Sequence, residues 1–86
     1  MRIIFHRGFK KKYSKLTRRD QKKFQQRLLL FEKDSDNPLL NNHQLKGQQE
    51  GYFSINVTGD LRALYRPVKK DTIFFITIDT HSNLYS

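Results

Sequence analysis

The sequence has no cysteine, and its 86 residues include only two prolines and four glycines. The absence of cysteine excludes disulfide bonds and metal sites built on thiolates. No apolar stretch approaches the roughly 20 residues of a transmembrane helix, and the one near the N-terminus is too short for a secretion signal. We therefore expect a cytoplasmic protein that makes no membrane contact.

Linkers, internal repeats and low-complexity segments are also absent. A chain this short buries only about 60–65% of the surface that its unfolded form exposes, so it supports one core and not two. Seven phenylalanines and four tyrosines supply large side chains for that core. We expect residues 1–86 to form a single domain.

Acidic residues are scarce in the first part of the chain. Residues 1–33 hold twelve Lys/Arg against two acidic residues, whereas residues 34–86 hold five against six, which together give the net charge of +9. A solvated helix face would mix its signs, so this imbalance favours a polyanionic partner, nucleic acid before membrane. The residues expected to bind RNA are Lys10, Lys11, Lys12, Lys15, Arg18, Arg19, Lys22, Lys23, Lys46 and Arg66.

The first half of the sequence predicts a strand and two helices. Residues 2–6 read as a short strand closed by Gly8, and the spacing of Phe9, Tyr13 and Leu16 predicts a short helix. A second helix follows, with Thr17 as its N-cap. It ends in the polar cluster at residues 34–38, where Pro38 disfavours helix.

In the second half the apolar period changes from a helical one to two. The expected elements are a loop over 39–49, strands over 53–57, 61–66 and 72–79, and a short polar tail over 80–86. Pro67 is expected to end the middle strand. The order β-α-α-β-β-β predicts an α+β fold, in which two N-terminal helices cover one face of a small, mostly antiparallel sheet.

The other sheet face is then expected to be free. On the strand over 61–66, Arg62, Leu64 and Arg66 point to one side, while Ala63 and Tyr65 point to the other. If the helices cover the side with Ala63, both arginines lie on the free face, where they are well placed for phosphate groups.

Several kinds of chemistry have no pattern in the sequence. The three histidines are 37 and 38 residues apart without Asp/Glu at ligand spacing, and no glycine-rich phosphate loop or nucleophile elbow occurs. We therefore expect no metal and no other cofactor. What remains is His43 and His81 in loops, Asp60 at a turn, and Arg62 and Arg66 on a strand.

This set suits RNA cleavage by the RNA's own 2′-hydroxyl group. That reaction needs a base, an acid and a cation near the phosphate, but no metal. Histidine titrates near neutral pH, and arginine matches phosphate geometry. Each residue also has a plainer interpretation, because loop histidines are usually surface residues and Asp60 after Gly59 is typical of a turn.

Four segments together resemble the YafQ branch of the RelE/ParE toxin superfamily. They are HQLKG at 43–47, GY at 51–52, GDLRALYR at 59–66 and THSNLY at 80–85. The motifs cover residues 40–86, and the first half agrees by element order and basic helices. The resemblance implies a RelE-like fold and a ribosome-dependent endoribonuclease that cuts mRNA in the ribosomal A site. It also implies a cognate antitoxin as partner.

The resemblance also implies roles for individual residues. His43 and His81 match two histidines of the YafQ-type site, Asp60 matches its acidic residue, and Arg62 matches a widespread arginine. His81 is then the general acid, and either His43 or Asp60 is the general base. Arg62 stabilises the charge on the phosphate, and Tyr85 stacks on or orients a base.

Two positions depart from the family pattern. Asn56 stands where the family has a further histidine, and Thr77 stands where it has an arginine on the last strand. If that arginine is needed, Arg62 or Arg66 must replace it, or the activity is low.

Two other functions compete with this one. A ParE-like toxin shares the fold but inhibits DNA gyrase, and the acid–base set argues against it. A catalytically weakened RNA- or ribosome-binding module is the other, and Asn56 and Thr77 keep it open. His6 is expected to be structural, and Tyr52 and Tyr65 to belong to the core.

Overall fold

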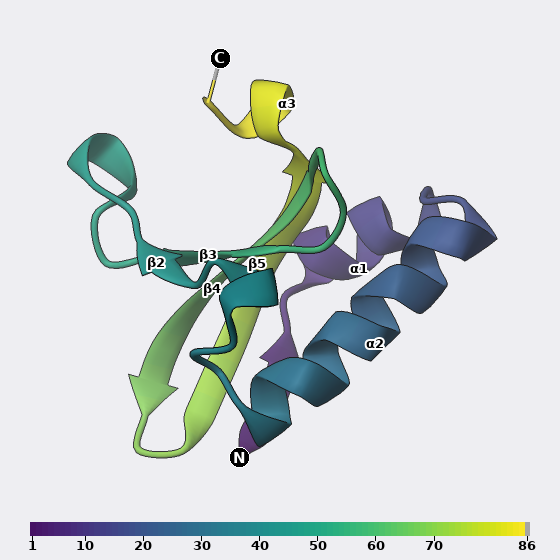
Figure 1. The fold of residues 1–86 in the computed structure, drawn as a ribbon. Helices are drawn as coiled ribbons and strands as arrows, with labels where there is room; N and C mark the ends of the chain where they lie inside the picture. The colour runs from purple at the N-terminus through teal and green to yellow at the C-terminus, as the bar shows by residue number, and fades with distance from the viewer. Residues whose placement is uncertain (86) are drawn as a thin grey trace.

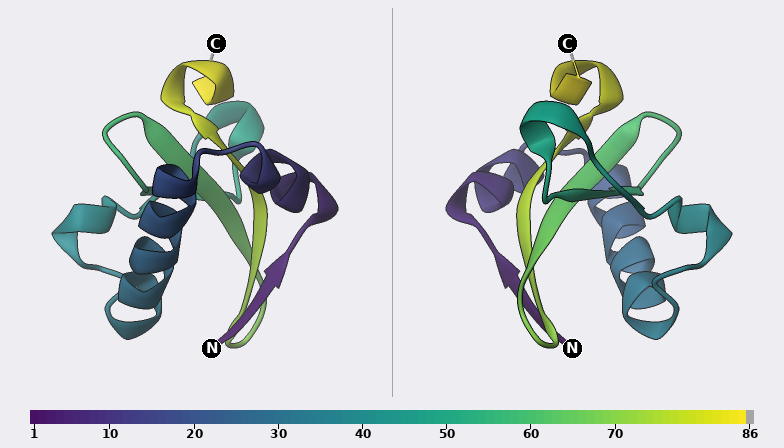
Figure 2. Two further views of the ribbon diagram at one scale, coloured as in Figure 1. Left: turned by 90° about the vertical axis from the view of Figure 1, so that its right-hand side faces the viewer. Right: turned by 90° about the vertical axis from the view of Figure 1, so that its left-hand side faces the viewer.

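A five-stranded mixed sheet, in the spatial order β1-β5-β4-β3-β2, forms the centre of the computed structural model, which describes residues 1–85 (Figure 1). The strands are β1 (Arg2–Phe5), β2 (His43–Gln44), β3 (Phe53–Asn56), β4 (Leu61–Lys69) and β5 (Thr72–Thr80). β1 pairs with β5 in parallel, and the other three pairings are antiparallel. Helices α1 (Arg7–Ser14) and α2 (Arg18–Lys33) lie together on one side of the sheet (Figure 2), so the predicted α+β fold is confirmed.

Both helices begin at side-chain caps. Thr17 Oγ1 accepts a hydrogen bond from the Asp20 amide (3.1 Å), as expected for the N-cap of α2. At α1 the cap is His6, whose Nδ1 accepts from the Gly8 amide (2.9 Å), so His6 has the structural role expected of it. The prediction that Gly8 closes the strand is wrong. Gly8 lies inside α1, where a Cβ atom would come within 3.1 Å of the His6 ring.

The core between the helices and the sheet is mostly aromatic. Its buried members are Phe9, Phe24, Phe31, Leu40, Ile55, Val57, Leu61, Ala63, Tyr65, Phe75 and Ile78. The ring of Phe75, on β5, lies 5.6–6.0 Å from five other aromatic rings, measured between centroids. This arrangement lets few but large side chains fill the interior of a chain poor in aliphatic residues.

Three expectations for the second half are wrong. The loop expected over 39–49 contains β2 between the 3₁₀ turns Pro38–Leu40 and Gly47–Gln49, and the tail folds into α3 (His81–Tyr85). Both elements are too short to show a period. β4 also continues through Pro67 to Lys69, because β3 pairs with β4 only as far as Tyr65. Pro67 therefore has no partner strand on the β3 side, where proline is tolerated, and on the other side it is the register partner of Ile73.

The sheet face away from the helices is not free, contrary to expectation. Leu45 and Leu64 are buried there, outside the aromatic core. Figure 1 shows the β2–β3 connection on the side of the sheet away from α1 and α2, and α3 at the end of β5. None of the helices in residues 1–85 is long and apolar enough to cross a membrane.

Candidate active site

A cleft of about 320 Å³ opens on the sheet face away from α1 and α2. Ser54 and Arg62 in its wall alternate along their strands with Ile55 and Ala63, which face the core under the helices. The complete lining is Asn41, His43, Leu45, Ser54, Arg62, His81 and Tyr85. Four of the five residues expected to be catalytic therefore share one cleft, although they come from three separate segments of the chain.

His43 is held in a defined orientation by β2. Its backbone pairs with Ser54 of β3, and its Nδ1 lies 2.7 Å from the carbonyl oxygen of Asn41. Because a carbonyl only accepts, Nδ1 must carry the proton and donate it. In the neutral ring this leaves the lone pair on Nε2, which is the form a general base requires. Asn41 adopts a left-handed backbone (φ 44°), a conformation that asparagine tolerates.

His81 and Tyr85 lie one turn apart on α3, with ring centroids 4.6 Å apart and planes inclined at 48°. Two bonds fix the start of this helix. Thr80 Oγ1 accepts from the Asn83 amide (3.2 Å), and the His81 amide donates to the Asp60 carbonyl (2.8 Å). The β3–β4 turn thereby holds α3 against the cleft.

Arg62 points its guanidinium group toward the same β3–β4 turn. Nη1 donates to the carbonyls of Thr58 (2.9 Å) and Leu61 (3.1 Å), and Nη2 donates to that of Gly59 (3.2 Å). No carboxylate pairs with Arg62 within residues 1–85. Three of its five N–H groups are thus used by neutral carbonyls, and its charge and two donors remain for an anion.

Asp60, the fifth expected catalytic residue, does not line the cleft. Its carboxylate is exposed, and its bonds are made by the backbone: the amide donates to Thr58 Oγ1 (3.3 Å), and the carbonyl accepts from His81. The structure therefore places Asp60 in the turn that supports α3, beside the other four residues but not among them.

The two positions that depart from the toxin pattern also lie outside the cleft. Asn56 is the register partner of Arg62, and its buried Oδ1 has no hydrogen-bond partner within the described residues. Thr77 is the register partner of Leu64. Neither residue lines the cleft, whose basic side chains are those of His43, Arg62 and His81.

Sequence reasoning assigned no role to three residues of the cleft, Asn41, Leu45 and Ser54. The buried Ser54 Oγ has no hydrogen-bond partner in the part of the chain that the structure describes. In the sequence, Ser54 stands out only as a polar residue that alternates with the apolar Phe53 and Ile55. Nothing in the sequence marks Asn41 as part of the site. Its role follows from the fold, which places its carbonyl oxygen 2.7 Å from His43 Nδ1.

No family model and no curated protein matches the sequence. Solved structures do match it. YafQ from E. coli strain BL21(DE3) is similar with a TM-score of 0.81 over all of both chains, at 20% identity. The YoeB/ParE toxin from Agrobacterium tumefaciens has a TM-score of 0.77 at 20% identity, over 94% of this chain and 99% of the toxin. The chain has the fold of the YafQ and YoeB toxins.

A further match is to an E. coli DinJ–YafQ complex, with a TM-score of 0.72 and 20% identity over all of both chains. At these identities the likeness to YafQ and YoeB establishes the fold. What the cleft can do depends on its own residues.

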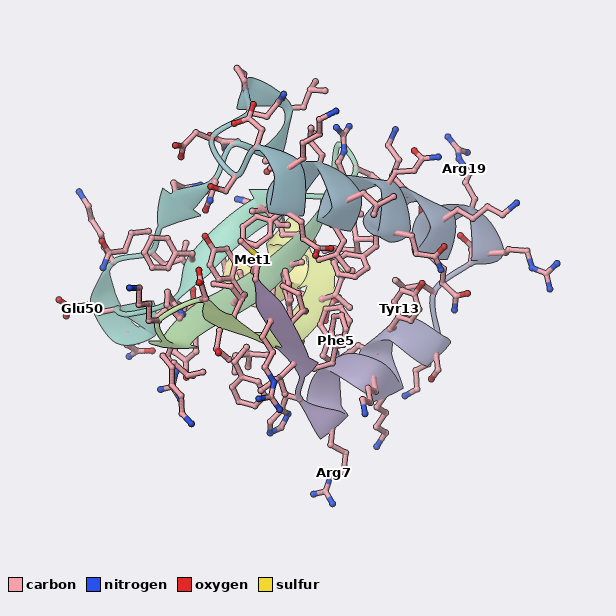
Figure 3. The ribbon with its side chains drawn as sticks, turned by 90° about the horizontal axis from the view of Figure 1, so that it is seen from below. Met1, Phe5, Arg7, Tyr13, Arg19 and Glu50 are labelled. Carbon is pink, nitrogen blue, oxygen red and sulfur yellow. The ribbon has the colours of Figure 1, made fainter. Side chains whose placement is uncertain are left out.

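Basic residues of this YafQ-type fold line a groove of about 640 Å³ between α2 and the β3–β4 turn. Arg19, Lys23 and Arg27 follow at four-residue intervals, about 6 Å apart along the helix, and Asp20 is the one acidic residue in the lining. Arg27, which was not among the expected RNA-binding residues, is half-buried and donates to the Val57 carbonyl (3.4 Å). Figure 3 shows Arg19 projecting outward near the start of α2.

The remaining basic residues fall into two groups. Lys10, Lys11, Lys15, Arg18, Lys22 and Lys46 are exposed and make no ion pair within residues 1–85. Lys12 instead pairs with Asp79 (2.8 Å), and this hydrogen bond outweighs the effect of burial and lowers the pKa of the Asp79 carboxyl. Lys12 therefore has a structural partner that its neighbours in α1 lack.

The two tyrosines expected in the core differ. Tyr65 is buried and donates to Asn42 Oδ1 (2.8 Å), and burial raises its pKa, so this expectation is confirmed. Tyr52 is only half-buried, with the Arg66 guanidinium 5.7 Å from its ring centroid, so it belongs to the surface and not to the core.

Within residues 1–85 no three His, Cys, Asp or Glu side chains are grouped closely enough to hold a metal ion.

Proposed function

We propose that this protein is a ribosome-dependent endoribonuclease toxin that cleaves mRNA in the ribosomal A site and is neutralised in the cytoplasm by a cognate antitoxin. The observation that carries the proposal is the cleft itself. It brings two imidazoles, an uncompensated guanidinium and an aromatic ring to one place on a toxin fold. That is the set of groups that metal-free cleavage of RNA requires.

In the proposed mechanism, His43 Nε2 removes the proton from the 2′-hydroxyl of the nucleotide before the cut. The freed oxygen attacks the adjacent phosphorus, and a bond forms between them as the bond to the leaving 5′-oxygen breaks. His81 donates the proton that the 5′-oxygen takes up. The products are a 2′,3′-cyclic phosphate and a 5′-hydroxyl, so no external nucleophile or metal is needed.

Arg62 and Tyr85 would bind the phosphate and a base of the RNA on which the two histidines act. The two free N–H groups of Arg62 would bind the phosphate oxygens, whose negative charge increases as the attacking oxygen adds. Tyr85 offers its ring to a base, where stacking contributes about 1–3 kcal/mol. Because Tyr85 already packs on His81, base stacking there would also place the His81 proton near the leaving oxygen.

His43 is preferred to Asp60 as the base because of their placement. His43 lines the cleft with its Nε2 lone pair available, whereas the Asp60 carboxylate is exposed outside the lining. Substituting each residue separately tests this choice. His43→Gln should lower the cleavage rate far more than Asp60→Asn, and the opposite order would make Asp60 the base.

The basic groove supplies a path for RNA that leads to the cleft. The β3–β4 turn is a wall shared by both: its carbonyls hold Arg62 on one side, and its residues line the groove with Arg19, Lys23 and Arg27 on the other. We propose that rRNA or the message binds here and that the ribosome orients the scissile phosphate. Free RNA would then be cut poorly, because positioning contributes much of the rate.

An acidic antitoxin is the natural partner for a chain of net charge +9. The DinJ–YafQ complex contains YafQ, which has the same fold, together with DinJ. We propose that the antitoxin of this chain likewise folds onto it, with acidic residues against the basic helices.

Toeprinting on a defined message with purified ribosomes tests the enzymatic proposal. Wild-type protein should produce new ends within the A-site codon, and His81→Ala should produce none while remaining folded. The absence of such ends with wild-type protein would contradict the proposal.

One observation favours a second candidate, an RNA- or ribosome-binding module without cleavage. Asn56 and Thr77, which cannot act as acid, base or cation, stand where the resembling toxins have a histidine and an arginine. In that case the protein would bind ribosomes and block translation without new RNA ends.

A further inference from the structure

The carboxylate of Asp79, near the end of β5, makes three hydrogen bonds. Its Oδ1 accepts from the Thr80 amide (2.8 Å) and from Asn83 Nδ2 (2.9 Å). Its Oδ2 accepts from Lys12 Nζ (2.8 Å), across 67 positions of the sequence. The Asp79 side chain is 17% exposed, so these contacts are partly shielded from water. Three separate elements, β5, α3 and α1, meet at this one side chain.

The helix α3, which Asp79 contacts, is too short to be stable on its own. α3 has five residues, and a helix of this length has too few internal bonds to offset the cost of its nucleation. Its position therefore depends on anchors from outside. These anchors are the Thr80 cap, the bond from the His81 amide to Asp60, the bond from Gln49 Nε2 to the Leu84 carbonyl (3.3 Å), and Asp79.

The partner of Asp79 also matters for the cleft. Asp79 is the register partner of Arg62 on the neighbouring strand, yet the two side chains form no ion pair. Lys12 occupies the carboxylate instead, while Arg62 binds only neutral carbonyls. The Lys12–Asp79 pair thus keeps a nearby carboxylate from neutralising the cation of the cleft.

We propose that Asp79 is a positioning residue of the site. It holds α3 so that His81 and Tyr85 face the cleft, and Lys12 keeps it in place and away from Arg62. The effect on cleavage rests on the proposed endoribonuclease function, whereas the effect on α3 does not. Lys12 consequently acts through Asp79 and not as a phosphate ligand, unlike the other lysines of α1.

Hydrogen exchange and ring NMR signals test the structural half of the proposal without any cleavage. In Asp79→Ala, exchange of the His81 amide should speed up about five- to tenfold, the usual cost of a lost helix cap. The His81 ring signals should move toward those of a histidine with no aromatic neighbour, because the Tyr85 ring 4.6 Å away shifts them in the folded helix. Asp79→Asn should keep the His81 amide exchange rate and the His81 ring signals close to those of wild type, since its amide oxygen still accepts from Thr80 and Asn83.

Ribosome-dependent cleavage tests the functional half. Asp79→Ala should lower kcat by about tenfold at an unchanged KM. Lys12→Gln should lower kcat by about two- to fivefold, as expected for an exposed pair. The matched control is Arg7→Gln, which removes the same charge from the same helix at an exposed residue that makes no ion pair within residues 1–85. It should leave kcat and KM unchanged.

Unchanged exchange and ring signals in both Asp79→Ala and Lys12→Gln would overturn the proposal, as would a Lys12→Gln effect confined to KM. If Asp79→Ala does not fold, Lys12→Gln decides the question, and unchanged exchange and ring signals in that variant would overturn the proposal. Wild-type protein that cleaves nothing would refute the proposed function, and the exchange data would still show whether Asp79 holds α3.

Discussion

The basic groove beside α2 predicts a specific change in how RNA binding depends on salt. Each phosphate contact on a single strand contributes about 0.7 to the slope of log K against log salt concentration. Replacing Arg19 and Lys23, which both line the groove, with Gln removes two contacts. The slope should therefore fall by about 1.4, so that the variant loses about sevenfold less affinity than wild type between 50 and 200 mM salt.

Fluorescence anisotropy of a labelled RNA oligonucleotide measures this slope, in a His81→Ala background so that the RNA stays intact. The matched control replaces Lys69 and Lys70 with Gln, at the end of β4 away from the groove. It removes the same charge and should change the slope little. Equal slopes for the two double variants would show that total charge matters and the groove does not, which would refute the reasoning.

Three further predictions concern the cleft and the core. His43→Gln and His81→Ala should each lower single-turnover cleavage on ribosomes by about 10²- to 10⁴-fold with an unchanged melting temperature, and a loss under tenfold would remove that residue from the chemistry. Phe75→Ala should lower the free energy of unfolding by about 3–5 kcal/mol in urea titrations, because one ring contacts five others. The Asp79 carboxyl has a pKa below its ordinary 3.8, so its contribution to stability is full above that value and lost as pH falls through the lower, folded-state pKa. Thermal melts of wild type and Asp79→Asn should therefore converge at low pH, and parallel curves down to pH 2 would contradict this.

The parts of the fold that could be predicted are those with a local signal. Thr17 is an N-cap because its side chain accepts a hydrogen bond from the amide of Asp20, three residues later, and both residues are visible in the sequence. The same holds for the two-residue period over 53–57. Gly8 was misread because glycine is common where a strand ends, and its actual role depends on the ring of His6.

The rest of the site depends on contacts between distant residues. β2 has two residues and forms only because β3 offers a partner to His43, so no period marks it. From the sequence, Pro67 predicts the end of a strand. That β4 continues through it follows only from the fold, in which β3 pairs with β4 no further than Tyr65. In the sequence Lys12 resembles its basic neighbours. Only its contact with Asp79, 67 residues later, distinguishes it from them. The resemblance to toxins identified His43 and His81, but only the fold shows that Asp60 stands apart from them.

The position of β5 in the sheet has a consequence for how the protein is made. β5 lies between β1 and β4, so the strand synthesised after all the others joins the first strand to the rest of the sheet. Its Phe75 then joins core rings that come from both earlier halves of the chain. A nascent chain that has not yet exposed β5 therefore lacks the β1–β5 and β4–β5 pairings, Phe75 and His81 together. Under the proposed function, the ability to fold and the ability to cut RNA should arise at the same moment during translation, and chains that terminate before β5 should be harmless to the ribosomes that made them.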